Sequence, residues 1–256
     1  IESYWSTRTE GYSEVNHKEL AGTQKNAWLK VLTSQFPDKP KEEIRILDIG
    51  TGPGFFPVIL AEAGYHVDAV DYTEGMLEKA KENAGDLCRN IRFLRMDAQK
   101  LDFEDNTFDV VISRNLTWNL EHPDVAYREW VRVLKVGGRL LNFDANWYGY
   151  LYEEEQRKAY ENDRKNVENN SLDDHYLCTD IERMERIALQ VPLSKISRPQ
   201  WDVKTLREAG LLGIRTDTEI WKTVWSEEER LNYQSTPMFM VTGVKPDHFL
   251  NLPVVE

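Results

Sequence analysis

Three glycines at alternate positions constrain the fold of this chain more than any other feature. Gly50, Gly52 and Gly54 follow an apolar run rich in β-branched residues, Ile44 to Ile49, and precede the apolar stretch Phe55 to Ala63. The run predicts a strand buried on both faces, and the stretch predicts a helix. Because glycine has no Cβ, such a loop can turn sharply and approach a ligand closely, beside the unpaired N–H groups of the helix.

The spacing of these glycines separates two kinds of cofactor-binding fold. A dinucleotide-binding loop has the pattern G-x-G-x-x-G, and its third glycine would fall at position 55. The chain has Phe55 there, and it has an acid, Asp48, two residues before Gly50. The resulting D-x-G-x-G-x-G pattern resembles motif I of the class I methyltransferases that depend on S-adenosyl-L-methionine (SAM).

Length and composition limit the classes of protein to which the chain can belong. Its 256 residues, 41% hydrophobic and 30% charged, suit a globular protein with one large domain or with a domain and a modest cap. A net charge of -12 disfavours a nucleic-acid partner. No apolar run of eighteen residues and no signal-peptide pattern is present, so we expect no membrane span and a cytoplasmic protein. The two cysteines, Cys88 and Cys178, have no metal-ligand spacing, so no metal site is predicted.

Apolar periodicity predicts alternating strands and helices after residue 43. The residues before Ala21 lack clear periodicity and suggest a mobile flap, whereas 21–36 predicts a helix. Pro123 opens a helix that the glycines at 137 and 138 are expected to stop. Thr179 and Glu182 suggest a capping box, and Asp202 suggests the cap of a short helix over 203–209. The other predicted helices cover 55–63 and 74–84, and the predicted strands cover 44–49, 65–71, 91–96, 108–113, 139–144, 214–220 and 238–241.

This order predicts an α/β fold with a doubly wound, Rossmann-like sheet. Seven strands, mostly parallel, would form the sheet, and the family topology makes the last strand antiparallel. We expect an N-terminal helical cap over 1–43, a SAM-binding core over 44–148, a helical lid insert over 149–200 and completion of the core over 201–256.

Candidate ligand groups follow the predicted strands at one edge of the sheet, where open α/β sheets bind ligands. Asp71 ends the second strand, at the place of an acid that accepts hydrogen bonds from ribose hydroxyls. Asp97 and Ala98 follow the third strand, Ser113 ends the fourth, and Arg114 and Asn115 follow it.

The resemblance to class I methyltransferases extends over roughly 44–244. The run R-V-L-K-V-G-G at 132–138 resembles the small-molecule branch that includes the ubiquinone and menaquinone biosynthesis methyltransferases, with a type 11 methyltransferase domain. It implies SAM as cofactor, S-adenosyl-L-homocysteine as product and a small-molecule acceptor. The cofactor-binding residues that it implies are Asp48, Gly50, Thr51, Gly52, Gly54, Asp71, Tyr72, Met76, Asp97, Ala98, Ser113, Arg114 and Asn115.

Methyl transfer from a sulfonium is an in-line displacement, to which an enzyme contributes mainly positioning and desolvation. A general base is needed only if the nucleophile must lose a proton. The residues that could act as this base are Asp144, His17, His122 and His175, and of these Asp144 and His175 are the predicted candidates. Aromatic and polar residues suit a pocket for a planar or cationic acceptor; the candidates are Tyr12, Trp118, Asn119, Trp147 and Tyr148.

Two other functions remain open from the sequence. Asp71 would equally suit an NAD-type Rossmann oxidoreductase, although Phe55 in place of the third glycine speaks against it. A SAM- or S-adenosyl-L-homocysteine-binding scaffold without catalysis is the second alternative, because methyl transfer needs no single invariant catalytic residue. The acceptor, its reacting atom and the oligomeric state are not determined by the sequence.

Overall fold

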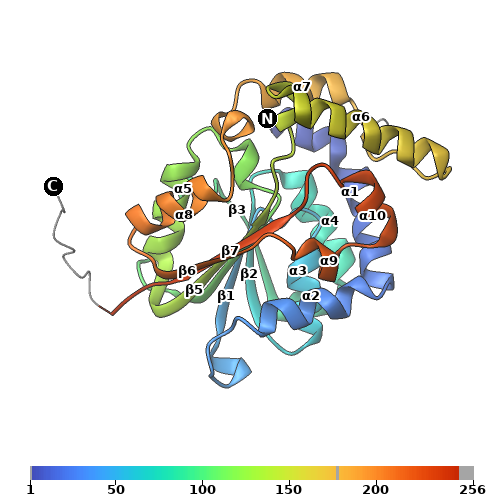
Figure 1. Cartoon of the computed structure of the whole chain (residues 1–256). Helices are drawn as coiled ribbons and strands as arrows, with labels where there is room; N and C mark the ends of the chain where they lie inside the picture. Colours follow the sequence, from blue (N-terminus) through green and yellow to red (C-terminus); the bar gives the residue numbers. More distant parts are fainter. Residues whose placement is uncertain (1, 177–178, 248–256) are drawn as a thin grey trace, which may run out of the picture.

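The computed structural model of the chain describes residues 2–176 and 179–247, and Cys178 lies outside this part. Seven strands form one sheet in the order β3-β2-β1-β4-β5-β7-β6 (Figure 1). Strands β1 to β5 pair in parallel, and β7 runs antiparallel to both β5 and β6. The predicted sheet is therefore confirmed. The strands are β1 (Arg45–Ile49), β2 (His66–Asp71), β3 (Ile91–Arg95), β4 (Phe108–Arg114), β5 (Leu134–Asp144), β6 (Leu212–Asp217) and β7 (Phe239–Val244).

Helices cover both faces of this sheet. Successive residues of each strand point to opposite faces, so each strand packs against helices on both sides. Ile46 of β1 packs with residues of α2 and α3, whereas Leu47 and Ile49 pack with residues of α5 and α8. These two groups of helices lie on opposite sides of the sheet (Figure 1). The described helices are α1 (Glu2–Ala21), α2 (Gln24–Thr33), α3 (Phe55–Glu62), α4 (Glu74–Ala84), α5 (Pro123–Val133), α6 (Glu154–Asn169), α7 (Ile181–Ala188), α8 (Gln200–Glu208), α9 (Trp221–Val224) and α10 (Glu227–Asn232), with short 3-10 turns at Lys41–Glu43, Gly85–Asn90, Thr117–Asn119, Gly149–Leu151 and Pro192–Lys195.

The N-terminal segment forms helix α1 in place of the predicted flap. Of its buried side chains only Tyr4 is aromatic, and Ser13, Asn16 and Glu19 are polar. A buried face of this composition shows no hydrophobic periodicity, which explains why the pattern did not indicate a helix. Helix α1 lies beside α4, to which Lys79 ties it through an ion pair with Glu10 of 3.1 Å.

Two predicted helix boundaries are wrong. Helix α5 ends at Val133, since Leu134 already pairs with Phe108 of β4, so the glycines at 137 and 138 lie within β5. In α8, Asp202 is an interior residue with no exposed surface, and it does not cap the helix. Its carboxylate is held by buried partners that the sequence could not indicate.

The insert between β5 and α8 contains α6 and α7, at the top of the view in Figure 1. The cap of α7 is Asp180, whose side chain accepts a hydrogen bond from the Arg183 N–H at 3.1 Å. Thr179 instead donates its hydroxyl to the Tyr176 carbonyl, so the predicted capping box at Thr179 and Glu182 is wrong. In the described part of the chain, no helix combines the length and apolarity needed to cross a membrane.

Candidate functional site

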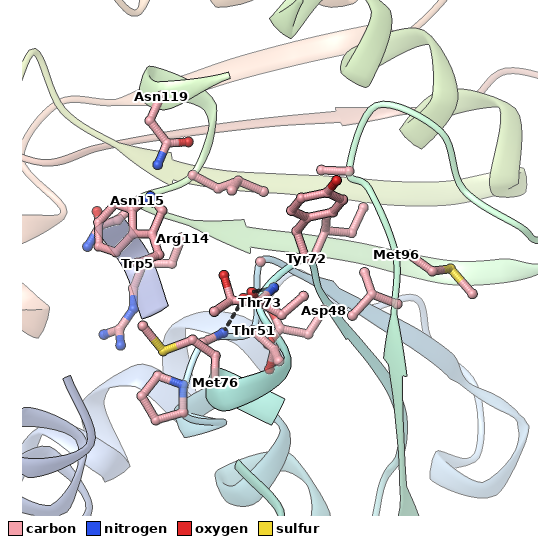
Figure 2. A pocket seen from close by; sticks show the side chains of 18 of the residues that line it. Trp5, Asp48, Thr51, Tyr72, Thr73, Met76, Met96, Arg114, Asn115 and Asn119 are labelled. Atoms are coloured by element: carbon pink, nitrogen blue, oxygen red, sulfur yellow. Dashed lines mark hydrogen bonds between the residues drawn. The ribbon is translucent and has the colours of Figure 1, made fainter. Parts of the chain in front are cut away.

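A cavity of about 460 Å³ lies at the carboxyl ends of β1 to β4 and is covered by α1. We call it the cofactor cavity. Figure 2 shows Trp5, Arg114 and Asn115 close together at one side of it, away from Met96. Most of the residues predicted to bind cofactor line this cavity, and they are Asp48, Gly50, Thr51, Gly52, Asp71, Tyr72, Met76, Asp97, Ala98, Arg114 and Asn115.

Two of the predicted residues do not line the cofactor cavity, and both hold the scaffold around it. Gly54 has a φ of +91°, and a Cβ there would lie 3.0 Å from the Ala80 Cβ, so this glycine lets α3 pack closely on α4. Ser113 is fully buried and donates its hydroxyl to the Ile49 carbonyl at 2.9 Å, which ties β4 to β1.

Asp71 organises the glycine loop from the end of β2. Its carboxylate accepts hydrogen bonds from the Gly52 N–H and the Thr73 N–H, both at 2.9 Å. Gly52 has a φ of +54°, and a Cβ there would meet open space. Burial raises the pKa of Asp71, and the two backbone donors oppose that shift. The loop therefore presents bare backbone to the cavity next to an acidic side chain.

Asp48 is a second acid of the cavity, and it is 3% exposed. Burial raises its pKa to about 7. The positive charge of Arg114 opposes this shift, but the Arg114 guanidinium is itself paired with Glu19 at 2.7 Å. A cation placed in the cavity beside Asp48 would favour its ionised form.

Helix α1 supplies three of the cavity residues that the sequence did not indicate. Glu2, Trp5 and Asn16 line the cofactor cavity together with the predicted Tyr12. These residues are spaced three to seven apart and so lie along one side of the helix. Glu2 and Asn16 are polar, so this side of the helix shows no apolar stripe in the sequence. Only the aromatic residues Trp5 and Tyr12 could have indicated it.

A second cavity of about 730 Å³ adjoins the first, and we call it the acceptor chamber. Trp118, Trp147 and Tyr148 line it, as does His175, whereas Asn119 lines the cofactor cavity. Five residues line both cavities and mark their junction: Trp5, Tyr12, Asn16, Arg114 and Asn115.

The two candidate bases lie in different surroundings. Asp144 is fully buried and lines neither cavity; its carboxylate is paired with Arg198 at 2.8 Å and accepts from the Trp118 N–H and the Trp147 indole, both at 2.9 Å. This arrangement anchors the chamber wall and disfavours Asp144 as a base. His175 lies in the chamber wall and contacts the hydroxyl of Tyr233.

Comparison with known proteins agrees with this geometry. Residues 47–142 match the family described as "Methyltransferase domain". The chain is 41% identical over 98 residues to the demethylmenaquinone methyltransferase of Clavibacter sepedonicus, which is 38% of this chain and 39% of that protein. The chain spans between about two fifths and three fifths of the length of the curated relatives that it matches.

Solved structures share the fold over almost the whole chain. A candidate SAM-dependent methyltransferase of Methanococcus maripaludis superposes with a TM-score of 0.62 at 20% identity, over 95% of this chain and 94% of that one. Phosphoethanolamine N-methyltransferase 2 of Haemonchus contortus, in complex with SAM, gives 0.61 at 19% identity, over 86% and 52%. The chain therefore contains a methyltransferase domain over residues 47–142, is distantly homologous to the demethylmenaquinone methyltransferases, and has the class I methyltransferase fold.

Proposed function

We propose that the chain transfers a methyl group from SAM in the cofactor cavity to a small-molecule acceptor in the acceptor chamber. One observation carries this proposal: the two cavities meet at a junction formed by five shared residues, among them Asn16 and Asn115. An in-line displacement requires donor and acceptor to approach from opposite sides of the methyl carbon, and two cavities that meet at a junction suit this requirement.

The residues of the cofactor cavity fit SAM chemically. Asp48 and Asp71 supply carboxylates for the amino group and the ribose hydroxyls, and Gly52 allows close approach to backbone. Tyr72 and Met76 would pack on the adenine, while Asp97 and the Ala98 N–H would hydrogen-bond its edge. The bound group would supply an activated methyl on a positively charged sulfur.

The contribution of the protein would be mainly to position the reactants and exclude water. Helix α1 covers both cavities, with Trp5 and Tyr12 at their junction. The Tyr12 ring lies edge-on to the Trp5 ring with 5.4 Å between centroids, which places an apolar wall at the junction. An apolar wall there would strip water from an attacking nucleophile.

A route for a departing proton starts in the chamber at Tyr233. The Tyr233 hydroxyl lies 3.0 Å from the Nδ1 of His175, and the His175 Nε2 lies 2.7 Å from a carboxylate oxygen of Glu228. An ionised carboxylate only accepts, so Nε2 carries the hydrogen and Nδ1 accepts from Tyr233. The Tyr233 oxygen can then accept a hydrogen bond from an acceptor molecule. We propose His175 as the proton acceptor, acting through Tyr233.

Calorimetric titration with SAM, S-adenosyl-L-homocysteine and NAD tests the proposed cofactor. We expect saturable binding of the two adenosyl ligands and none of NAD. Asp71→Ala should weaken the binding of both adenosyl ligands at least ten-fold, whereas Asp71→Asn should retain one hydrogen-bond acceptor for the glycine loop. Asp102 is an exposed acid outside the cavity, so Asp102→Ala should bind these ligands as the wild type does. NAD binding without SAM binding would overturn the assignment. Turnover of labelled SAM with small acceptors separates an enzyme from a scaffold that only binds.

A further inference from the structure

We infer that the methyl acceptor is an amine, held as a cation among the aromatic rings and carboxylates of the acceptor chamber and methylated on nitrogen. This inference rests on the proposed function and adds the substrate class to it. Three features of the chamber carry it: its aromatic wall, its charge, and the unpaired amide oxygens at the junction with the cofactor cavity.

Aromatic side chains dominate the chamber wall. Among the described residues that line it, nine are Trp or Tyr, contributed by α1, the ends of β4 and β5, the insert and the segment around α10. Trp118 and Tyr148 lie 4.9 Å apart between centroids, and Tyr233 lies edge-on to Trp147 at 5.3 Å. Rings set at angles to one another around a cavity present several π faces and edges, and an alkylammonium group is the ligand that such faces attract.

The charge of the chamber has the sign that a cation requires. Six carboxylates and three basic side chains occur among the described residues that line it. Two of the carboxylates are already paired, Glu19 with Arg114 and Asp174 with Arg164 from outside the lining, which leaves four carboxylates against Arg8 and Lys18. A quinone or a phenol would gain nothing from this excess of negative charge, whereas an ammonium group would be attracted by it.

Glu229 is the carboxylate best placed to hold the cation. One of its oxygens accepts from the Gln24 amide at 2.6 Å and from the Ser226 N–H at 2.8 Å, and both of these donors are neutral. Burial and the nearby charge of Glu19 raise the pKa of Glu229, and the charge of Arg114, which is paired with Glu19, opposes this shift. A bound ammonium would supply the counter-charge that these neutral donors lack.

The junction with the cofactor cavity offers acceptors for N–H groups. Asn16 is 3% exposed, and both Asn16 and Asn115 line the two cavities. The carboxamide oxygens of both residues are buried without a hydrogen-bond partner in the described structure. A buried acceptor without a partner is costly, and the N–H groups of an amine at the junction would satisfy it.

The chemical step balances with the groups present. The bound ammonium first loses one proton, through the Tyr233 oxygen to the Nδ1 of His175, which exposes the nitrogen lone pair. That lone pair forms the new N–C bond while the C–S bond breaks, and the electron pair of that bond stays on sulfur. The products are the methylated ammonium and S-adenosyl-L-homocysteine, and the proton on His175 passes to solvent.

Charge recognition is tested with choline and its neutral carbon isostere, 3,3-dimethylbutan-1-ol. Both are titrated calorimetrically into the full chain saturated with S-adenosyl-L-homocysteine. We expect choline to bind roughly ten-fold or more tightly than the alcohol. Glu229→Gln should weaken choline binding about ten-fold and leave the nucleotide affinity unchanged. Glutamine at this position keeps the capping box with Ser226, so α10 is retained.

Glu227→Gln is the matched control, because this substitution removes the same charge from the same helix at a residue that is exposed and lies outside the chamber. Equal binding of choline and the alcohol, or no binding of either to the nucleotide-saturated chain, would overturn the amine inference. Failure of the nucleotide itself to bind would instead refute the proposed function.

Turnover provides a second, independent test of the acceptor class. Labelled SAM is incubated with the chain and with primary and secondary amines, phenols, thiols and a reduced naphthoquinone. Label on the nitrogen of amines supports the inference, and label only on carbon, oxygen or sulfur refutes it while leaving the methyltransferase function intact.

Discussion

Arg114 and Glu19 form a two-pronged ion pair that ties helix α1 to the end of β4. The two N–O distances are 2.7 and 3.1 Å, and the side chains are 18% and 6% exposed. The guanidinium also lies 4.8 Å and 5.0 Å from the ring centroids of Phe55 and Phe56. Because α1 buries few apolar side chains, this pair is a main connection between the helix over the cavities and the core.

Breaking this pair should loosen the cover of the cofactor cavity. Glu19→Gln would leave the partly buried Arg114 without its ion-pair partner, so we expect the free energy of unfolding to fall by about 3 kcal/mol. Dissociation of S-adenosyl-L-homocysteine, measured by stopped-flow fluorescence, should become about ten-fold faster. Glu10→Gln, which breaks the exposed pair with Lys79 on the same helix, should change either quantity little. Identical dissociation rates in the two variants would show that α1 does not gate the cavity.

The raised pKa of Asp48 predicts a specific dependence of stability on pH. Its pKa is about 7 in the folded chain against 3.8 as the ordinary value, so folding favours the protonated form. The associated stability is fully present below about pH 4 and is lost as pH rises through about 7, by up to about 4 kcal/mol.

Asp48→Asn should remove this dependence. The unfolding free energy of the variant, measured in urea between pH 4 and pH 8, should therefore exceed that of the wild type increasingly towards pH 8. Asp102→Asn, an exposed acid, serves as control. A constant difference between wild type and Asp48→Asn across this range would mean that Asp48 titrates normally.

The sheet could be predicted because its central strands have a recognisable pattern of apolar residues in the sequence. Runs such as 108–113 are mostly apolar, and they are buried on both faces, as expected of a strand covered by helices on both sides. The acids at the strand ends could be placed as well, since parallel strands bring their carboxyl ends to one edge. Asp71 and Asp97 thus line the cavity that the sequence indicated.

Parts that depend on polar burial could not be predicted. Helix α1 buries Ser13 and Glu19, whose partners Asn83 and Arg114 lie far along the chain. Asp202 resembled a helix cap because the sequence does not show that the distant Tyr127 donates its buried hydroxyl to this carboxylate. The role of Glu229 could not be predicted either, because this residue both belongs to the capping box of α10 and lines the chamber. Such residues become recognisable only when tertiary contacts are known.

Arg198 holds two carboxylates in the interior, Asp144 at 2.8 Å and Asp202 at 2.7 Å, and all three side chains are fully buried. Arg198→Met would leave two buried acids without a cation, so we expect the unfolding free energy to fall by about 3–5 kcal/mol in urea titration. Arg128→Met breaks an exposed pair with Asp124 and should cost less than about 0.5 kcal/mol. Equal losses in both variants would contradict a structural role for the buried pair.

His175 is assigned the role of proton acceptor through Tyr233, and chemical rescue tests this role. His175→Ala should lower kcat for an amine acceptor by about 100-fold with little change in KM, because the acceptor contacts Tyr233 and not the imidazole. Added imidazole should restore part of kcat in a saturable manner, which replacement of a merely structural side chain would not allow. Tyr233→Phe should show the same loss without rescue, since its ring is retained and only the hydroxyl that conducts the proton is removed. A rise in KM with unchanged kcat, or loss without rescue in His175→Ala, would instead assign His175 to the packing of the chamber wall.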